Sequence, residues 1–316
     1  MKVLVTGGNG FVGRELVLRL LQAETRLLGQ RIEQLTVADM SCQGLPANPR
    51  LVCVEGSIAD PLVLERAVAD EPDLVFHLAS IPGGAAERNF ELGLDVNLHA
   101  TLNLFEAMRQ FAQTPRMVFT STIAVYGSPL PDYIDDHTPF KPHLSYGAHK
   151  LATEIVLEDY SRRGFIDGRT VRLPGIVARP PQPSGLLSAF MSDVFWKLRD
   201  GEPFVCPVSP QAVAWFMSVE CCVDNLLHAA TLEEAAVVPR RDFTLPVLRL
   251  SMETLIQGLA DRYGQDRLAL VSYEPNAELE AGFGALPPLD AQAALALGYR
   301  HDADIDALIS AATGHL

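Results

Sequence analysis

Three glycines, spaced three residues apart, separate a short apolar segment near the start of the chain from a segment with helical periodicity. Lys2–Thr6 is apolar enough for a buried strand, and residues 11–24 place apolar side chains every three or four positions, which predicts a helix. Gly7, Gly10 and Gly13 lie in the turn between them. A strand that turns directly into a helix begins a β-α-β unit, which restricts the chain to a parallel sheet covered by helices.

The first half of the chain continues this alternation. Further strands are predicted at residues 35–39, 51–54, 74–78, 116–122 and 170–173, and further helices at residues 61–69, 90–113 and 146–163. Parallel strands joined by right-handed crossovers form a sheet with helices on both faces. We therefore predict an α/β fold with a doubly wound parallel sheet of the Rossmann type.

The sharpest break in the chain is the segment R-P-P-Q-P-S at residues 179–184. Prolines interrupt regular structure, so this segment is a natural boundary. We predict a nucleotide-binding domain over residues 1–178 and a smaller, mainly substrate-binding lobe over residues 179–316, some segments of which return to the first domain. Helices are expected in this second part at residues 186–199, 219–232 and 251–263.

Charge and composition exclude several classes of partner. The formal net charge is −14, which is unfavourable for binding nucleic acid or an anionic membrane surface. No apolar run is long enough to cross a membrane, and no secretory signal opens the chain, so we expect a cytoplasmic protein. The five cysteines are odd in number and lack C-x-x-C spacing, which favours free thiols over disulfides or a metal site.

The glycine-rich turn has the features of a dinucleotide site. Gly7 permits the tight turn, Gly10 permits close approach of a pyrophosphate, and Gly13 lets the helix lie against the strand. Backbone N–H groups at the start of the helix, at Phe11 and Val12, would face the phosphates together with the positive end of the helix dipole.

Two aspartates at strand ends suit the adenosine half of such a cofactor. Asp39 ends the second predicted strand, where a carboxylate accepts both ribose hydroxyls and repels a 2′-phosphate. No arginine follows within ten residues, so NAD is favoured over NADP. Asp60 follows the third strand and could reach the adenine amino group, although the same position suits a helix N-cap.

Tyr146 and Lys150 lie four residues apart on a predicted helix and therefore share one face. Oxidation of an alcohol requires a group that accepts the hydroxyl proton, and a phenol with its usual pKa of about 10 is a poor base at neutral pH. A neighbouring ammonium stabilises the phenolate. Ser121 and Thr122, at the carboxyl end of the preceding strand, offer hydroxyls that could orient the substrate oxygen.

These motifs, in this order, resemble the extended short-chain dehydrogenases/reductases of the NAD-dependent epimerase/dehydratase superfamily over nearly the whole chain. The matching segments are T-G-G-N-G-F-V-G at residues 6–13, H-L-A at 77–79, S-T-I-A-V-Y-G at 121–127 and Y-G-A-H-K at 146–150.

The resemblance implies that Thr122 is the active-site hydroxyl, Tyr146 the acid/base and Lys150 its modulator. It also implies that Asn97 supports the lysine environment, and that further residues line the cofactor, namely Leu78, Ala79, Ser80 and Pro174. It further implies a homodimer formed through the helices near residues 90–113 and 146–163. His77, on an apolar strand, is interpreted as a packed core histidine.

The sequence constrains the substrate less than it constrains the cofactor and the catalytic residues. Most extended members act on nucleotide sugars and carry an asparagine that contacts the diphosphate, whereas the matching stretch here is Arg172-Leu173-Pro174-Gly175. A second phosphate contact, usually basic, falls at Val213. The segments 119–127, 159–165 and 171–174 are instead similar to D-erythronate dehydrogenases, which oxidise the C2 hydroxyl of a four-carbon sugar acid.

We therefore expect an NAD-dependent oxidoreductase that acts on a small hydroxy acid. Arg179 is the candidate for binding the carboxylate, although it could equally be a surface residue, and Ser80 and Gly83 are expected to shape the pocket. The alternatives are an enzyme similar to L-threonine dehydrogenase, a nucleotide-sugar epimerase or dehydratase, and a non-catalytic NAD-sensing relative.

Overall fold

The computed structural model describes residues 1–181 and 187–314. In this part of the chain the largest sheet has seven strands, in the order β12-β8-β7-β6-β1-β4-β5. Their bounds are Lys2–Thr6 (β1), Gln34–Asp39 (β4), Leu51–Glu55 (β5), Leu74–His77 (β6), Arg116–Thr122 (β7), Asp167–Leu173 (β8) and Asp242–Thr244 (β12). β1 pairs in parallel with β4 and β6, which in turn pair in parallel with β5 and β7. The predicted α/β fold of the Rossmann type is confirmed.

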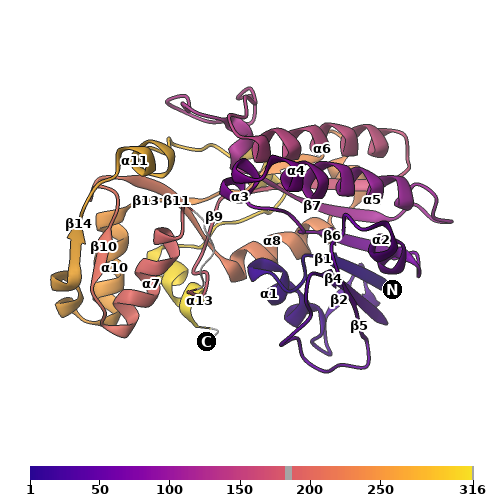
Figure 1. The fold of residues 1–316 in the computed structure, drawn as a ribbon, viewed down its shortest axis with the longest axis horizontal. Coiled ribbons are helices and arrows are strands. Elements are labelled where there is room, and N and C mark those ends of the chain that lie inside the picture. The colour runs from indigo at the N-terminus through magenta and orange to yellow at the C-terminus, as the bar shows by residue number, and fades with distance from the viewer. Residues whose placement is uncertain (182–186, 315–316) are drawn as a thin grey trace. The chain divides into compact units, whose positions relative to one another are not determined.

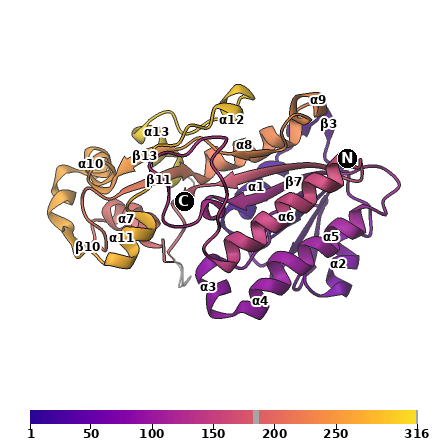
Figure 2. The ribbon, with the colours of Figure 1, turned by 90° about the horizontal axis from the view of Figure 1, so that it is seen from above.

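Helices cover both faces of this sheet (Figures 1 and 2). One face carries α2 (Pro61–Val68), α5 (Ala100–Met108) and α6 (Ser145–Arg162), whose apolar side chains pack with β1, β6 and β7 in one buried cluster. On the other face, α1 (Phe11–Leu20) and α8 (Val219–Thr231) are joined by an ion pair between Arg19 and Asp224 at 3.1 Å. Within the described residues, no helix is both long and apolar enough to cross a membrane.

The helix predicted over residues 90–113 is one continuous path with an irregular middle. It consists of α4 (Phe90–Leu94), a π-helical turn η1 (Asp95–His99) and α5, which ends at Met108. A π turn inserts one extra residue without ending the helix, so the helical periodicity of the sequence hides it. Residues 26–31, between α1 and β4, form a small hairpin of β2 (Arg26–Leu27) and β3 (Gln30–Arg31).

The chain divides into two compact units, each built from separate segments. The first consists of residues 1–127, 140–172 and 223–243, and the second of residues 128–139, 173–222 and 244–316. In the described part of the second unit, β11 (Val213–Ser218) lies between β9 (Gly175–Val177) and β13 (Leu248–Ser251). Its helices include α7 (Phe190–Asp200), α10 (Met252–Tyr263), α11 (Ala277–Phe283) and α13 (Ile305–Thr313). The predicted first residues of α7, from 186, fall partly outside the described residues.

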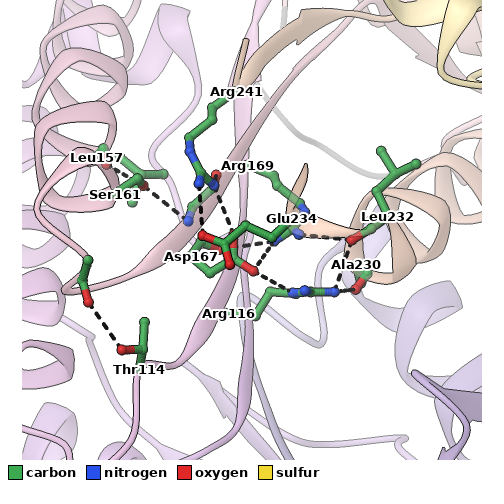
Figure 3. Close-up of polar contacts among 12 residues, drawn as sticks. Thr114, Arg116, Leu157, Ser161, Asp167, Arg169, Ala230, Leu232, Glu234 and Arg241 are labelled. Atoms are coloured by element: carbon green, nitrogen blue, oxygen red, sulfur yellow. Dashed lines mark hydrogen bonds and ion pairs between the residues drawn. The ribbon is translucent and has the colours of Figure 1, made fainter. Parts of the chain in front are cut away.

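Three arginines hold the last segment of the first unit against the sheet (Figure 3). Arg116, Arg169 and Arg241 surround the Asp167 carboxylate, each at 2.8–2.9 Å. Arg116 also donates to the Ala230 carbonyl at the end of α8, at 2.7 Å. Cations at a helix C-terminus satisfy its last carbonyls and favour its dipole. The cluster therefore anchors α8 to β7 and β8.

Candidate active site

The glycine-rich turn brings the start of α1 close to β1 and to the segment after β6. Gly7 has a φ of +69°, and a Cβ there would lie 2.7 Å from the Ala79 nitrogen. A Cβ at Gly13 would lie 2.0 Å from the Gly7 oxygen. At Gly10, by contrast, the nearest atom to an added Cβ is the Gly7 oxygen at 3.3 Å. The turn is thus closed toward the sheet and open on its Gly10 side.

Asp39 lies beside this turn. Its Oδ2 accepts a hydrogen bond from the Asn9 N–H at 2.8 Å. The Asn9 side chain donates to the carbonyls of Ser41 and Gln43, and Arg14 donates to the Asn9 Oδ1 at 3.1 Å. The sequence-based expectation considered arginines after Asp39 only, so it missed Arg14, which reaches the same region from α1.

Asp60 is the N-cap of α2, and its Oδ1 accepts from the Leu62 N–H at 2.9 Å. This is the structural alternative that the sequence left open. Its contact with adenine stays a prediction.

The segment after β6 is fixed by Asn97. Asn97 lies in the π turn and is 1% exposed, and its amide accepts from the Ile81 N–H at 2.7 Å and donates to the Ile81 carbonyl at 3.0 Å. Both atoms of the amide therefore hold the loop that contains Leu78, Ala79 and Ser80. The structure places Asn97 against this loop. The role near the lysine that the family resemblance implied stays a prediction.

Tyr146 lies in the first turn of α6, with hydroxyls from two strand ends around its phenol. Burial raises the pKa of Tyr146, and hydrogen bonds with Ser80 and Thr122 lower it. A Cβ at Gly83 would lie 3.7 Å from the tyrosine ring, so Gly83 also borders the site. Ser80 was predicted to line the cofactor and to shape the pocket, but its pairing with Tyr146 could not be read from the sequence because the two are 66 residues apart.

Lys150 follows Tyr146 by one helical turn and is 1% exposed. Its ammonium donates to the Thr120 carbonyl at 2.8 Å and lies over the Phe119 ring, 4.6 Å from the ring centre. Burial lowers the pKa of Lys150 to about 7, and the Glu154 carboxylate opposes this shift. The lysine is thus held at the end of β7, where burial disfavours its charge and the Glu154 carboxylate favours it.

Ser121 and Thr122 point in different directions. Ser121 donates its hydroxyl hydrogen bond to the Glu154 carboxylate and is buried, whereas Thr122 bonds with Tyr146. Both partners belong to α6, so the two hydroxyls bond to different turns of the same helix. The structure brings Thr122, and not Ser121, to Tyr146.

Comparisons with known proteins agree with this arrangement. A model of the NAD-dependent epimerase/dehydratase family matches residues 3–241. The chain belongs to this family. It is 40% identical to the D-erythronate dehydrogenase of Cupriavidus necator, with 98% of this chain and 97% of the relative covered. It is 34% identical to the protein of the same name from Haemophilus influenzae, with 98% of each covered.

A solved structure is also closely similar to this chain. The structure is described as a nucleoside-diphosphate-sugar epimerase from Agrobacterium tumefaciens, and it superposes with a TM-score of 0.91 at 34% identity. The alignment covers 98% of this chain and 92% of that one. Both the first-unit sheet and the C-terminal segments therefore follow the architecture of the family.

The first unit fits the NAD that characterises the family. The N-cap residue of α1 is Gly10, which has no side chain to cap the first N–H groups, and a pyrophosphate can approach its open side. Asp39 lies at the adjacent strand end, where it suits the ribose hydroxyls. Phe11 and Val12 are the first residues of α1, as predicted.

His77 serves packing, as the sequence indicated. It is fully buried, with Nδ1 joined to the Thr6 hydroxyl at 2.6 Å and Nε2 joined to the Thr101 hydroxyl at 2.9 Å. Burial lowers the pKa of His77 to about 3, and the nearby Lys150 charge lowers it further in the same direction. The ring is therefore neutral in the physiological range and both nitrogens are occupied.

The remaining predicted residues belong to the second unit. Pro174, Arg179 and Val213 lie on or beside its strands. The backbone of Arg179 is fixed by the Ser192 hydroxyl at 3.0 Å and by the Trp196 indole N–H at 2.6 Å. Their roles toward cofactor and substrate stay predictions.

Proposed function

We propose that this protein oxidises the C2 hydroxyl of D-erythronate to the 2-oxo acid, with Tyr146 as the proton acceptor. The observation that carries the proposal is the phenol of Tyr146 between the hydroxyls of Ser80 and Thr122, which come from two neighbouring strand ends. Carboxyl ends of strands are where open α/β sheets bind ligands. The names of the relatives from Cupriavidus necator and Haemophilus influenzae support the substrate.

In this proposal, each residue acts on the hydroxyl that loses its proton. Thr122 and Ser80 orient the substrate oxygen, and Tyr146 accepts the proton as the C–H bond breaks. NAD, when bound, accepts the hydride. Burial raises the pKa of Tyr146, and the hydrogen bonds with Ser80 and Thr122 oppose that rise. We propose that the charge of Lys150, one helical turn away, also favours the phenolate that accepts the proton.

The substrate class follows from what the chain offers and lacks. A four-carbon acid needs one cationic group for its carboxylate, and Arg179 is the proposed partner because guanidinium binds carboxylate through two parallel hydrogen bonds. A nucleotide sugar, as in the name of the Agrobacterium tumefaciens structure, is disfavoured because Leu173-Pro174-Gly175 and Val213 replace the usual diphosphate contacts.

We further propose a cytoplasmic homodimer that functions in carbohydrate metabolism. Among the described residues, the helices α4 and α6 expose large apolar side chains, with Phe90 55% and Ile155 61% exposed. Exposed apolar patches mark interaction surfaces. Free thiols at all five cysteines agree with a reducing compartment.

Absorbance of NADH tests the reaction. Purified protein with NAD is expected to form NADH with D-erythronate, and not with L-threonine or a nucleotide sugar. NADH formation with a nucleotide sugar, or with none of the three, would contradict the proposed substrate.

A tyrosine substitution tests the residue. Tyr146→Phe is expected to lower kcat by about 10²–10⁴-fold, the usual contribution of general acid–base catalysis, while the Kd for NAD changes little. Tyr160→Phe, later on α6, is the matched control, because its hydroxyl contacts Glu106 on α5. Full turnover by Tyr146→Phe would assign the proton transfer to another group.

A further inference from the structure

A buried carboxylate that the proposed chemistry does not use lies on the same helix as Tyr146 and Lys150. Glu154 is 5% exposed and follows Lys150 by four residues, as Lys150 follows Tyr146. Residues four apart on a helix share one face. The inward face of α6 therefore presents a phenol, an ammonium and a carboxylate in successive turns.

Two strands hold this carboxylate in place. Ser121, at the end of β7, donates its hydroxyl to Glu154. Arg172, on β8, donates from Nε at 3.1 Å and from Nη2 at 2.5 Å to the Glu154 Oε2. Arg172 is itself 1% exposed and contacts a second carboxylate, Asp242 of β12, at 2.6 Å.

Arg172 contacts both oxygens of Glu154, which is the geometry of a paired, ionised carboxylate. Burial raises the pKa of Glu154, and the charge and hydrogen bonds of Arg172, followed by the hydrogen bond from Ser121, oppose that rise. Asp242 raises it further, but Asp242 shares Arg172 and is partly exposed. A charged carboxylate in a low-dielectric interior acts strongly on a nearby ammonium.

Lys150 has few other groups that favour its charge. The Thr120 carbonyl and the Phe119 ring contact it from β7, and both favour a cation. From β6 it faces His77, which is neutral. The Glu154 carboxylate is the charge that opposes the desolvation of the lysine.

We propose that Glu154 is a positioning residue that keeps Lys150 cationic at neutral pH and holds Ser121 away from Tyr146. This proposal rests on the proposed roles of Tyr146 and Lys150. In this proposal Arg172 of β8 holds the Glu154 carboxylate in place, the carboxylate favours the charged form of Lys150, and the Lys150 ammonium favours the phenolate of Tyr146. Because Ser121 is bound to Glu154, Thr122 is left as the hydroxyl of β7 that orients the substrate.

Because the chain has few lysines, the protonation of Lys150 can be measured directly. The sequence contains four lysines, Lys2, Lys141, Lys150 and Lys197. Lysine labelled with ¹³C at Cε reports its own protonation by NMR, and Lys150→Arg assigns the Lys150 signal. This readout does not depend on turnover, so it separates failure of the Glu154 proposal from failure of the Tyr146 proposal.

In a pH titration, Glu154→Gln is expected to lower the pKa of Lys150 by about one unit, since it removes the opposite charge that favours the ammonium. Asp242→Asn is the matched control, because it removes a carboxylate from Arg172 that does not act on Lys150, and the Lys150 signal should move by only a few tenths of a unit. In kinetics, the alkaline fall of kcat/KM in Glu154→Gln is expected to begin at lower pH than in the unaltered protein.

A merely structural salt bridge predicts a different pattern. Glu154→Gln would then lower the melting temperature but leave both the Lys150 titration and the alkaline limb unchanged, and that result would overturn the proposal. Equal Lys150 shifts in Glu154→Gln and Asp242→Asn would overturn it as well. If Glu154→Gln fails to fold because Arg172 is left with one partner, the variant Glu154→Gln/Arg172→Met removes both buried charges. It is compared with Arg172→Met alone, and the pKa of Lys150 is expected to be lower in the double variant.

Discussion

At the scale of single residues, Asp39 is the group that we expect to select the cofactor, from a position beside the glycine turn. The Asn9 N–H already holds one of its oxygens, and the Asn9 side chain contacts the following loop at Ser41 and Gln43. A 2′-phosphate would meet the negative charge of Asp39, while the Arg14 guanidinium is already bound to Asn9 and to the Gly44 carbonyl. We therefore expect Asp39 to favour NAD.

Asp39→Asn is expected to raise the ratio of kcat/KM for NADP to that for NAD by about 10–100-fold, because it removes a repulsion of about 1–3 kcal/mol at a partly exposed site. Steady-state kinetics with both cofactors measures the ratio. Asp60→Asn is the control, because any contact with adenine is common to NAD and NADP. An unchanged ratio in Asp39→Asn would mean that the Asn9 loop alone selects the cofactor.

Residue pairs close in the chain could be predicted more easily than their orientations. The i, i+4 spacing placed Tyr146 and Lys150 on one face of a helix, and the structure agrees. The choice between Ser121 and Thr122 depends on which residue of α6 each hydroxyl bonds to, and only the packed structure determines this. Glu154 has the same spacing after Lys150, but its burial depends on Arg172 from another strand.

At the scale of elements, the π turn between α4 and α5 sets the position of the loop after β6. The extra residue of η1 turns Asn97 inward, where its amide contacts both backbone groups of Ile81. This loop carries Ser80, one of the two hydroxyls at Tyr146. The irregular helix thus contacts, through Asn97, the loop that borders the candidate active site.

Asn97→Ala is expected to lower the free energy of unfolding by about 1–3 kcal/mol, since two partly buried backbone groups of Ile81 lose their partner. It should also lower kcat/KM for the hydroxy acid, because Ser80 is no longer held toward Tyr146. Thermal unfolding and NADH absorbance measure the two effects. Asn103→Ala, at an exposed position of α5, should change neither. A loss of stability with unaltered kcat/KM would show that the loop keeps its position without Asn97.

Elements with strong periodicity could be predicted closely. The strands Lys2–Thr6 and Arg116–Thr122 have the predicted bounds, and α6 begins and ends one residue before its prediction. The break within residues 90–113 was not foreseen, because one inserted residue barely disturbs a helical pattern. Short helices such as Gly83–Arg88 and Ala277–Phe283 have too few turns to show a period.

At the scale of the whole molecule, the chain passes between its two compact units several times. The sequence suggested one boundary at residue 178 with later segments returning, whereas contacts group residues 223–243 with the first unit and residues 128–139 with the second. The return depends on the arginine cluster around Asp167 and the end of α8 (Figure 3), which joins residues more than 50 positions apart. Such pairings leave no local signal in a sequence.

Association of two chains is the prediction that belongs to this scale. The side chain of Ile155 is 61% exposed on α6, beside α4 with its exposed Phe90. Burying these groups in a dimer removes apolar surface from water, whereas a glutamate at the same position would place an unpaired charge in the interface. Ile155→Glu is therefore expected to raise the Kd of the dimer at least about a hundredfold.

Sedimentation equilibrium at micromolar concentration measures this Kd. Leu62→Glu on α2 is the control, because Leu62 is 68% exposed but lies on another helix. A monomer in the unaltered protein, or equal Kd values in the two variants, would place the interface elsewhere or exclude it.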